Sequence, residues 1–168
     1  MKKVMQTMFP TDGEPMRGDC LRACVASIFE CPIDEVPHFC EHRNWEELLD
    51  EWLGQYGLAH VFIRINVETS EGYLGCIDGG VWLIVSGTTK RHPTRLHSVV
   101  ARTLKGGVRW EYQHDPHPSG AFLEDAKDLL FFIQREPWAQ RKEHELRSRA
   151  ADGPGEEVRK WGSGKVRR

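Results

Sequence analysis

The sequence predicts an α+β fold in which two helices precede an antiparallel β-sheet. Two amphipathic helical patterns occupy the first third of the chain, and five short segments rich in β-branched and aromatic residues follow them. With 168 residues and 39% hydrophobic content, the chain is long enough for one domain with a substantial core. We place this domain at residues 1–136, followed by a charged surface helix at 137–150 and a flexible basic tail at 151–168.

The first predicted helix begins at Cys20, with Asp19 as its N-cap. Its apolar side chains recur with helical spacing: Leu21, Cys24, Val25, Ile28 and Phe29. In the first turn of a helix, unpaired backbone N–H groups stabilise an anion and lower the pKa of a thiol from about 8.5. We therefore interpret Cys20 as a nucleophile and Cys24, one turn further on, as a packing residue.

The second helix is predicted from Trp45 to Tyr56, with Asn44 and Glu47 as a capping box and Gly57 at its end. Its aromatic face is typical of core packing, which we favour over a ligand platform. The predicted strands are Leu58–Ile65, Val81–Val85, Leu96–Arg102, Val108–Gln113 and Leu129–Gln134.

A histidine and an aspartate follow the cysteine along the chain. His97 lies near the start of one predicted strand, and Asp115 follows the next. The turn at residues 105–107 predicts a hairpin, which would bring the two side chains close together. A cysteine nucleophile needs such a base and a group that fixes the imidazole tautomer. His114 and His117 flank Asp115 and remain alternatives to His97.

These residues resemble the papain-like cysteine peptidases, and among them the bacteriocin-processing peptidases that cleave double-glycine leader peptides. The resemblance covers roughly residues 4 to 135 and suggests a compact phage or bacterial member. The matching segments are Asp19-Cys20-Leu21-Arg22-Ala23-Cys24-Val25-Ala26, His97-Ser98-Val99-Val100 and Asp115-Pro116. The resemblance implies that Gln6 helps to form the oxyanion hole. Leu21 replaces the glycine that usually follows the nucleophile, and the segment between Gln6 and Cys20 is longer than in those peptidases.

The resemblance implies a papain-like fold and a cysteine-dependent hydrolase that cleaves a peptide, isopeptide or other amide bond through a thioester. Its catalytic residues would be Cys20, His97 and Asp115, its substrate a peptide or protein, and it would need no cofactor or metal. One alternative is a catalytically inactive papain-like fold that binds a protein. A second is a zinc-binding protein, for which the candidate ligands are Cys31, His38, Cys40 and His42, although their spacing differs from that of paired zinc knuckles.

Composition excludes several other classes. The sequence has no apolar stretch typical of a membrane span or export signal, so we expect the protein in the cytoplasm. Its number of cysteines, five, is odd, and we expect these thiols to be reduced. Residues 141–168 carry nine Lys and Arg against five Asp and Glu, yet no nucleic-acid motif accompanies them, so a solvated tail is the favoured interpretation.

We expect the polar segments 68–75 and 87–94 to rim a cleft and set substrate choice.

Overall fold

The computed structural model describes residues 1–9, 18–65, 79–105 and 109–135, all within a compact unit formed by residues 1–135. Two α-helices and two short 3₁₀ helices come first: α1 (Cys20–Phe29), η1 (Ile33–Glu35), η2 (Phe39–Glu41) and α2 (Trp45–Gly54). Five strands follow: β1 (Leu58–Arg64), β2 (Trp82–Thr88), β3 (His97–Thr103), β4 (Trp110–His114) and β5 (Asp125–Gln134). The predicted surface helix, the basic tail, the segment 68–75 and the glycines of the 105–107 turn lie outside the described residues.

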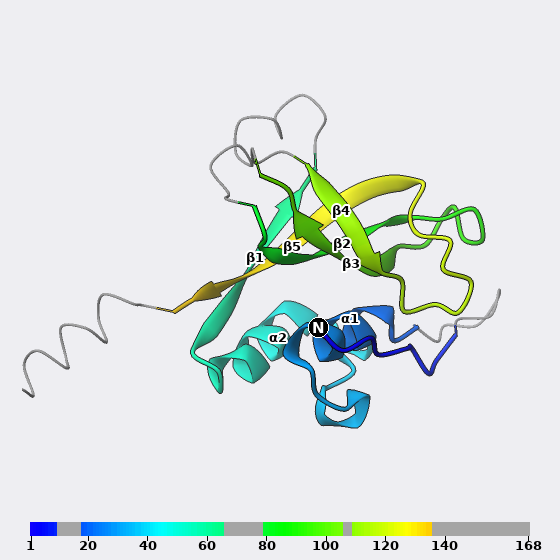
Figure 1. Ribbon diagram of the computed structural model, residues 1–168. Coiled ribbons are helices and arrows are strands. Elements are labelled where there is room, and N and C mark those ends of the chain that lie inside the picture. Colours follow the sequence, from blue (N-terminus) through cyan, green and yellow to red (C-terminus); the bar gives the residue numbers. More distant parts are fainter. Residues whose placement is uncertain (10–17, 66–78, 106–108, 136–168) are drawn as a thin grey trace, which may run out of the picture. The chain divides into compact units, whose positions relative to one another are not determined.

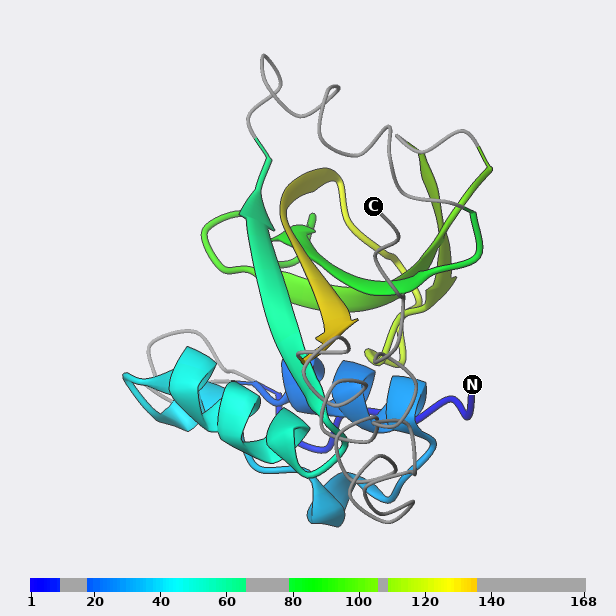
Figure 2. The same ribbon diagram turned by 90° about the vertical axis from the view of Figure 1, so that its left-hand side faces the viewer.

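The strands form one antiparallel sheet in the order β1-β5-β2-β3-β4, so the α+β prediction is confirmed. Both helices lie against the same face of this sheet (Figure 1). The sheet itself is strongly curved (Figure 2). β5 is the last strand in sequence but lies between β1 and β2, so β1 is joined to the rest of the sheet through β5.

Helix α1 forms as the apolar pattern predicts, but its first turn is held differently. Cys24, Val25 and Ala26 are fully buried beneath the sheet. The helix ends at Glu30, which adopts a left-handed conformation with φ of 58°. Asp19 precedes the helix, yet its side chain makes no capping hydrogen bond. The predicted capping role is therefore wrong, because other donors take the carboxylate.

Helix α2 forms as predicted, but the predicted capping interaction at its N-terminus is again absent. Leu49 and Leu53 are fully buried, as its apolar face predicts. The predicted capping box is wrong, because Asn44 Nδ2 donates to Glu47 Oε2 at 3.3 Å and neither side chain caps the backbone. Gly57 follows the helix with φ of 68°, a conformation that glycine adopts without strain.

All five predicted strands form, and each differs from its predicted bounds by one to four residues at one or both ends. The largest differences are that β2 extends to Thr88 and that β5 begins at Asp125, four residues before the predicted start at Leu129. The added residues are mostly polar or small, so hydrophobic patterning missed them. A register irregularity between Ser86 and Gly87 accommodates this extension where β2 meets β5.

Apolar side chains pack on both faces of the sheet. The face toward the helices contributes Ile84, Val100 and Leu130 to a core shared with α1 and α2. The opposite face carries a second core: Leu83, Val85, Val99, Ala101, Leu129 and Phe131. In the described ranges no helix is long and apolar enough to cross a membrane.

Candidate active site

The hairpin of β3 and β4 brings His97 and Asp115 together, as its turn predicts. The strands pair antiparallel, and His97 Nε2 lies 2.7 Å from Asp115 Oδ1. The same carboxylate accepts hydrogen bonds from the backbone N–H groups of His117, at 2.8 Å, and Phe122, at 3.0 Å. Asp115 is therefore fixed by its own loop and holds the imidazole from one side.

Cys20 lies on the other side of the imidazole. It is the first residue of α1, and α1 packs against β3, the strand that carries His97 and Ser98. Its thiol interacts with the His97 ring and with Ser98, and both interactions lower its pKa. Because Asp115 occupies Nε2, the nitrogen left for the thiol is Nδ1. The three residues predicted from the sequence thus form one connected group.

The electrostatics of this group favour an ion pair. Burial opposes ionisation of Cys20 most strongly, but hydrogen bonding to His97, the charge of His97 and the bonds to Ser98 together lower the pKa of the thiol. Burial likewise opposes a charged His97, yet Asp115 and Cys20 outweigh it and raise the pKa of the imidazole to about 9. The interaction between the two groups therefore favours the thiolate and imidazolium forms relative to an isolated thiol and imidazole.

Asp115 completes the charge arrangement. Burial acts to raise the pKa of its carboxyl group, but the hydrogen bonds to His97 and to the two backbone N–H groups lower it to about 2. The carboxylate is 6% exposed and stays negative throughout the physiological pH range. It stabilises the imidazolium form of His97.

Gln6 lies in the same cleft as Cys20, as the resemblance implies. Its backbone N–H donates to Pro116 O at 3.0 Å, which joins the N-terminal segment to the loop that carries Asp115. Its side-chain Nε2 donates to Met8 O at 3.0 Å, whereas Oε1 is buried and has no hydrogen-bond partner among the residues that the structure describes. The Nε2 atom of Gln6 carries two N–H groups. One donates to Met8, so the other remains available as a donor. An unpaired buried amide oxygen costs about 1 to 3 kcal/mol, and such groups are unusual outside functional sites.

Asp19 positions the segment that carries Gln6, a role that its place before a helix did not reveal. The side chain is 1% exposed. Its oxygens accept from the Thr7 backbone at 3.0 and 3.2 Å, from Thr7 Oγ1 at 2.8 Å and from the Met8 backbone at 2.8 Å. The residue next to the nucleophile thereby fixes the N-terminal segment beside it.

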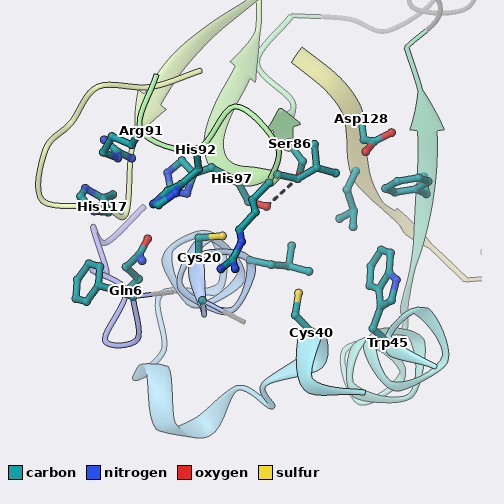
Figure 3. A pocket seen from close by; sticks show the side chains of 18 residues that line it. Gln6, Cys20, Cys40, Trp45, Ser86, Arg91, His92, His97, His117 and Asp128 are labelled. Carbon is teal, nitrogen blue, oxygen red and sulfur yellow. Dashed lines mark hydrogen bonds between the residues drawn. The ribbon is translucent and has the colours of Figure 1, made fainter. Parts of the chain in front are cut away.

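A cleft of about 620 Å³ opens at Cys20 (Figure 3). Side chains from both helices, from the N-terminal segment, from four strands and from two loops line it: Gln6, Phe9, Gly18, Cys20, Leu21, Cys40, Trp45, Phe62, Ser86, Arg91, His92, Arg95, Leu96, His97, Ser98, His117, Asp128 and Leu130. Of the two loops predicted to rim the cleft, the segment 87–94 contributes Arg91 and His92. Trp45 packs edge-on against Phe62 with ring centroids 5.8 Å apart, so an aromatic residue assigned to core packing also forms a cleft wall.

A line of polar residues crosses four strands, and we call it the transverse polar row: Arg64, Asp128, Ser86 and Ser98. The last three line one wall of the cleft, and Arg64 continues the row outside it. Arg64 lies directly opposite Asp128, Asp128 opposite Ser86, and Ser86 opposite Ser98. Ser86 and Ser98 share a hydrogen bond of 2.8 Å between their hydroxyl oxygens. Sequence reasoning missed these residues. Each is only a polar residue within a strand, a faint signal that can be recognised only once the strand order is known.

The other candidate residues have different roles. His114 is buried and its Nε2 lies 2.8 Å from Val4 O, so it anchors the N-terminal segment. His117 faces the edge of His97, with ring centroids 6.2 Å apart, and its Nδ1 lies 2.9 Å from Ser119 Oγ. Cys24 is fully buried and burial raises the pKa of its thiol, as expected for a packing residue.

The candidate zinc ligands do not converge. Across the described ranges no group of three or more His, Cys, Asp and Glu side chains is placed to hold a metal ion. His38 and His42 flank the 3₁₀ helix η2, whereas the zinc alternative requires an extended segment there. No disulfide joins the four cysteines within those ranges, Cys20, Cys24, Cys31 and Cys40.

No protein-family model, no curated protein and no solved structure matches this chain. The function is therefore argued from the geometry and chemistry of the site.

Proposed function

We propose that this protein is a cysteine hydrolase with a papain-like arrangement that cleaves a peptide, isopeptide or other amide bond. The observation that carries the proposal is the placement of His97 between Cys20 and Asp115, on the wall of a cleft of about 620 Å³. A helix-start thiol, an imidazole and a carboxylate in contact are the parts that nucleophilic acyl transfer needs.

In the proposed reaction, the Cys20 thiolate attacks the carbonyl carbon of the substrate. The oxyanion accepts hydrogen bonds from the backbone N–H of Cys20 and from the remaining N–H of the Gln6 amide. The His97 imidazolium donates its proton to the nitrogen of the leaving amine. The C–N bond breaks, and the acyl group remains on sulfur as a thioester.

Water completes the cycle. His97, now neutral, accepts a proton as a water molecule attacks the thioester carbonyl. The C–S bond breaks, the carboxylic acid leaves, and Cys20 and His97 return to the thiolate and imidazolium forms. Asp115 holds the ring through both steps and does not transfer a proton itself.

The first test is alkylation of the native protein with substoichiometric iodoacetamide between pH 5 and 9, read by intact mass and peptide mapping. Because the pKa of Cys20 is lowered, we expect it to react at pH 6 at least about tenfold faster than a thiol with an ordinary pKa. His97→Ala should remove most of this advantage, since only Ser98 then offsets the effect of burial on the pKa of the thiol. Cys40→Ser is the matched control, because Cys40 is another half-buried thiol on the same cleft.

Turnover is the second half of the test. A library of fluorogenic peptide amides should be hydrolysed by the wild type and not by Cys20→Ala. Fast alkylation without turnover of any amide would support the protein-binding alternative. Slow alkylation of Cys20 across the whole pH range would contradict an activated cysteine–histidine pair.

A further inference from the structure

Asp128 is a buried carboxylate on the cleft wall that the proposed reaction does not use. It is 3% exposed, yet it lines the cleft together with Leu130, its neighbour two residues along β5. A buried carboxylate is strongly disfavoured unless a cation or hydrogen-bond donors compensate it. The position of Asp128 therefore indicates that a positive partner is needed on this side of the cleft.

The partner within the protein is a weak one. Arg64 Nε lies 3.3 Å from Asp128 Oδ1, and the side chain of Arg64 is 81% exposed. Such an exposed guanidinium interacts mainly with water and contributes little to an ion pair. Arg64 is not among the residues that line the cleft, so it approaches the carboxylate from outside and leaves the cleft side to another group.

The walls beside Asp128 are apolar. Trp45, Phe62 and Leu130 line the same end of the cleft, and Figure 3 shows Trp45 and Asp128 on one side of Cys20. An apolar slot that leads to a buried carboxylate matches a side chain with a hydrocarbon stem and a cationic tip. An aromatic wall favours a cation further, through the negative face of its ring.

The opposite end of the cleft has the reverse charge. Arg91, His92 and His117 line it, and Figure 3 shows them on the other side of Cys20. Burial and the neighbouring charge of Arg91 lower the pKa of His117, so Arg91 and not His117 supplies the positive charge of this end. A cationic substrate group would be repelled from this basic end and attracted to the end that holds Asp128.

This polarity also orients the substrate. His97 gives its proton to the leaving amine, and His117 lies edge-on to His97, so the leaving group belongs at the basic end. The acyl part of the substrate then extends toward Trp45 and Asp128. We propose that Asp128 forms a subsite for a cationic side chain, of the lysine or arginine type, in the acyl part of the substrate.

This inference deepens the proposed function, and its test is made independent of catalysis. Acetylated tetrapeptide amides that contain one lysine, at either of the two central positions, are titrated into Cys20→Ala protein by NMR. Each is compared with the same peptide containing norleucine, which keeps the stem and lacks the ammonium group. We expect a dissociation constant about 10- to 100-fold lower for lysine at one of the two positions, as for a buried charge-assisted hydrogen bond.

Three further variants, all made in the Cys20→Ala protein, assign the effect to Asp128. Asp128→Asn should bring the lysine and norleucine affinities to within about twofold, because the amide keeps the shape and loses the charge. Asp125→Asn, an exposed residue of the same strand, should keep the lysine preference. Arg64→Gln should keep or increase the preference for lysine over norleucine, because it removes a cation that competes for Asp128. This variant replaces Asp128→Asn in the test if Asp128→Asn does not fold.

Equal affinity for lysine and norleucine at both positions would overturn the subsite, as would a preference that persists in Asp128→Asn. Neither result depends on whether Cys20 is reactive. Conversely, slow alkylation of Cys20 would contradict the hydrolase and leave an Asp128-dependent preference standing as binding of a cationic side chain.

Discussion

The chemistry of the site depends on one side chain, His97, because both of its ring nitrogens are engaged. Asp115 accepts at Nε2 with a distance of 2.7 Å, which fixes the tautomer and leaves Nδ1 toward Cys20. A ring held in this way can exchange its proton only with the thiol or with a group bound in the cleft. Asp115 thus determines the direction of proton transfer without contacting the reacting atoms.

Gln6 should matter for turnover and not for the reactivity of the thiol. Gln6→Ala removes the proposed oxyanion donor, and the loss of one such donor lowers turnover by about 10²- to 10³-fold. The alkylation rate of Cys20 should stay the same, because Gln6 is not among the groups that shift the pKa of the thiol. The measurement is the turnover of the best peptide amide next to the iodoacetamide rate.

Gln6→Glu is the matched control for shape. It keeps the size of the side chain and replaces the donor by an acceptor, so it should lower turnover at least as much as Gln6→Ala. Full turnover in both variants would show that the oxyanion is stabilised elsewhere.

At the scale of elements, Gly87 sets how closely β2 and β5 approach at the site. A Cβ atom at this position would lie 2.1 Å from the backbone oxygen of Asp125, far inside van der Waals contact. Gly87 also lies opposite His97 in the sheet and next to the register irregularity. The glycine is therefore required by the close approach of the two strands.

Gly87→Ala should force these strands apart at the end that carries His97 and Ser86. We expect a loss of about 1 to 3 kcal/mol in the free energy of unfolding, as for other overpacked positions, together with slower alkylation of Cys20. Urea unfolding and iodoacetamide kinetics measure the two effects. Gly54→Ala is the control, because its Cβ would meet only the Arg135 side chain, at 3.5 Å, and alanine favours a helix. Wild-type stability in Gly87→Ala would show that β5 can shift without cost.

Sequence patterns predicted both α-helices and all five strands, because the hydrophobic spacing that defines such elements is local in the sequence. The spacing of Leu21, Cys24 and Val25 is sufficient for α1, and the hairpin of β3 and β4 follows from a short turn. The role of Asp19 was not predictable in this way. Its carboxylate has two sets of possible donors, the helix N–H groups and the Thr7–Met8 backbone, and only the folded chain shows that the second set binds it.

At the scale of the whole molecule, the strand order determines which residues of different strands become neighbours. This order could not be predicted from the sequence. Asp128 and Ser86 are neighbours because β5 lies between β1 and β2, and this pairing joins segments far apart in the chain. No local pattern specifies such an insertion, so the transverse polar row could not be assembled from periodicity. The group of Cys20, His97 and Asp115 could be predicted from the sequence. Each of these residues lies at the start or end of a helix or strand, and local sequence patterns predict those helices and strands.

The group formed by Asp115, His97 and Cys20 also links the sheet to the helical layer, so global stability should depend on the ionisation of Asp115. The pKa of this carboxyl group is about 2 in the folded protein against an ordinary value of 3.8. A lowered pKa contributes stability that is complete above 3.8 and is lost as the pH falls through 2. A shift of this size corresponds to about 2 kcal/mol.

Urea unfolding of the wild type and of Asp115→Asn at several pH values from 2 to 6 measures this contribution. The wild type should be more stable than the variant at pH 5 to 6, and the difference should shrink by about 2 kcal/mol as the pH falls to 2. Asp125→Asn, which removes an exposed carboxylate of β5, should follow the wild-type curve throughout. A difference between wild type and Asp115→Asn that stays constant with pH would mean that Asp115 stabilises the fold through its shape and hydrogen bonds alone, and that its charge does not hold the imidazolium in place.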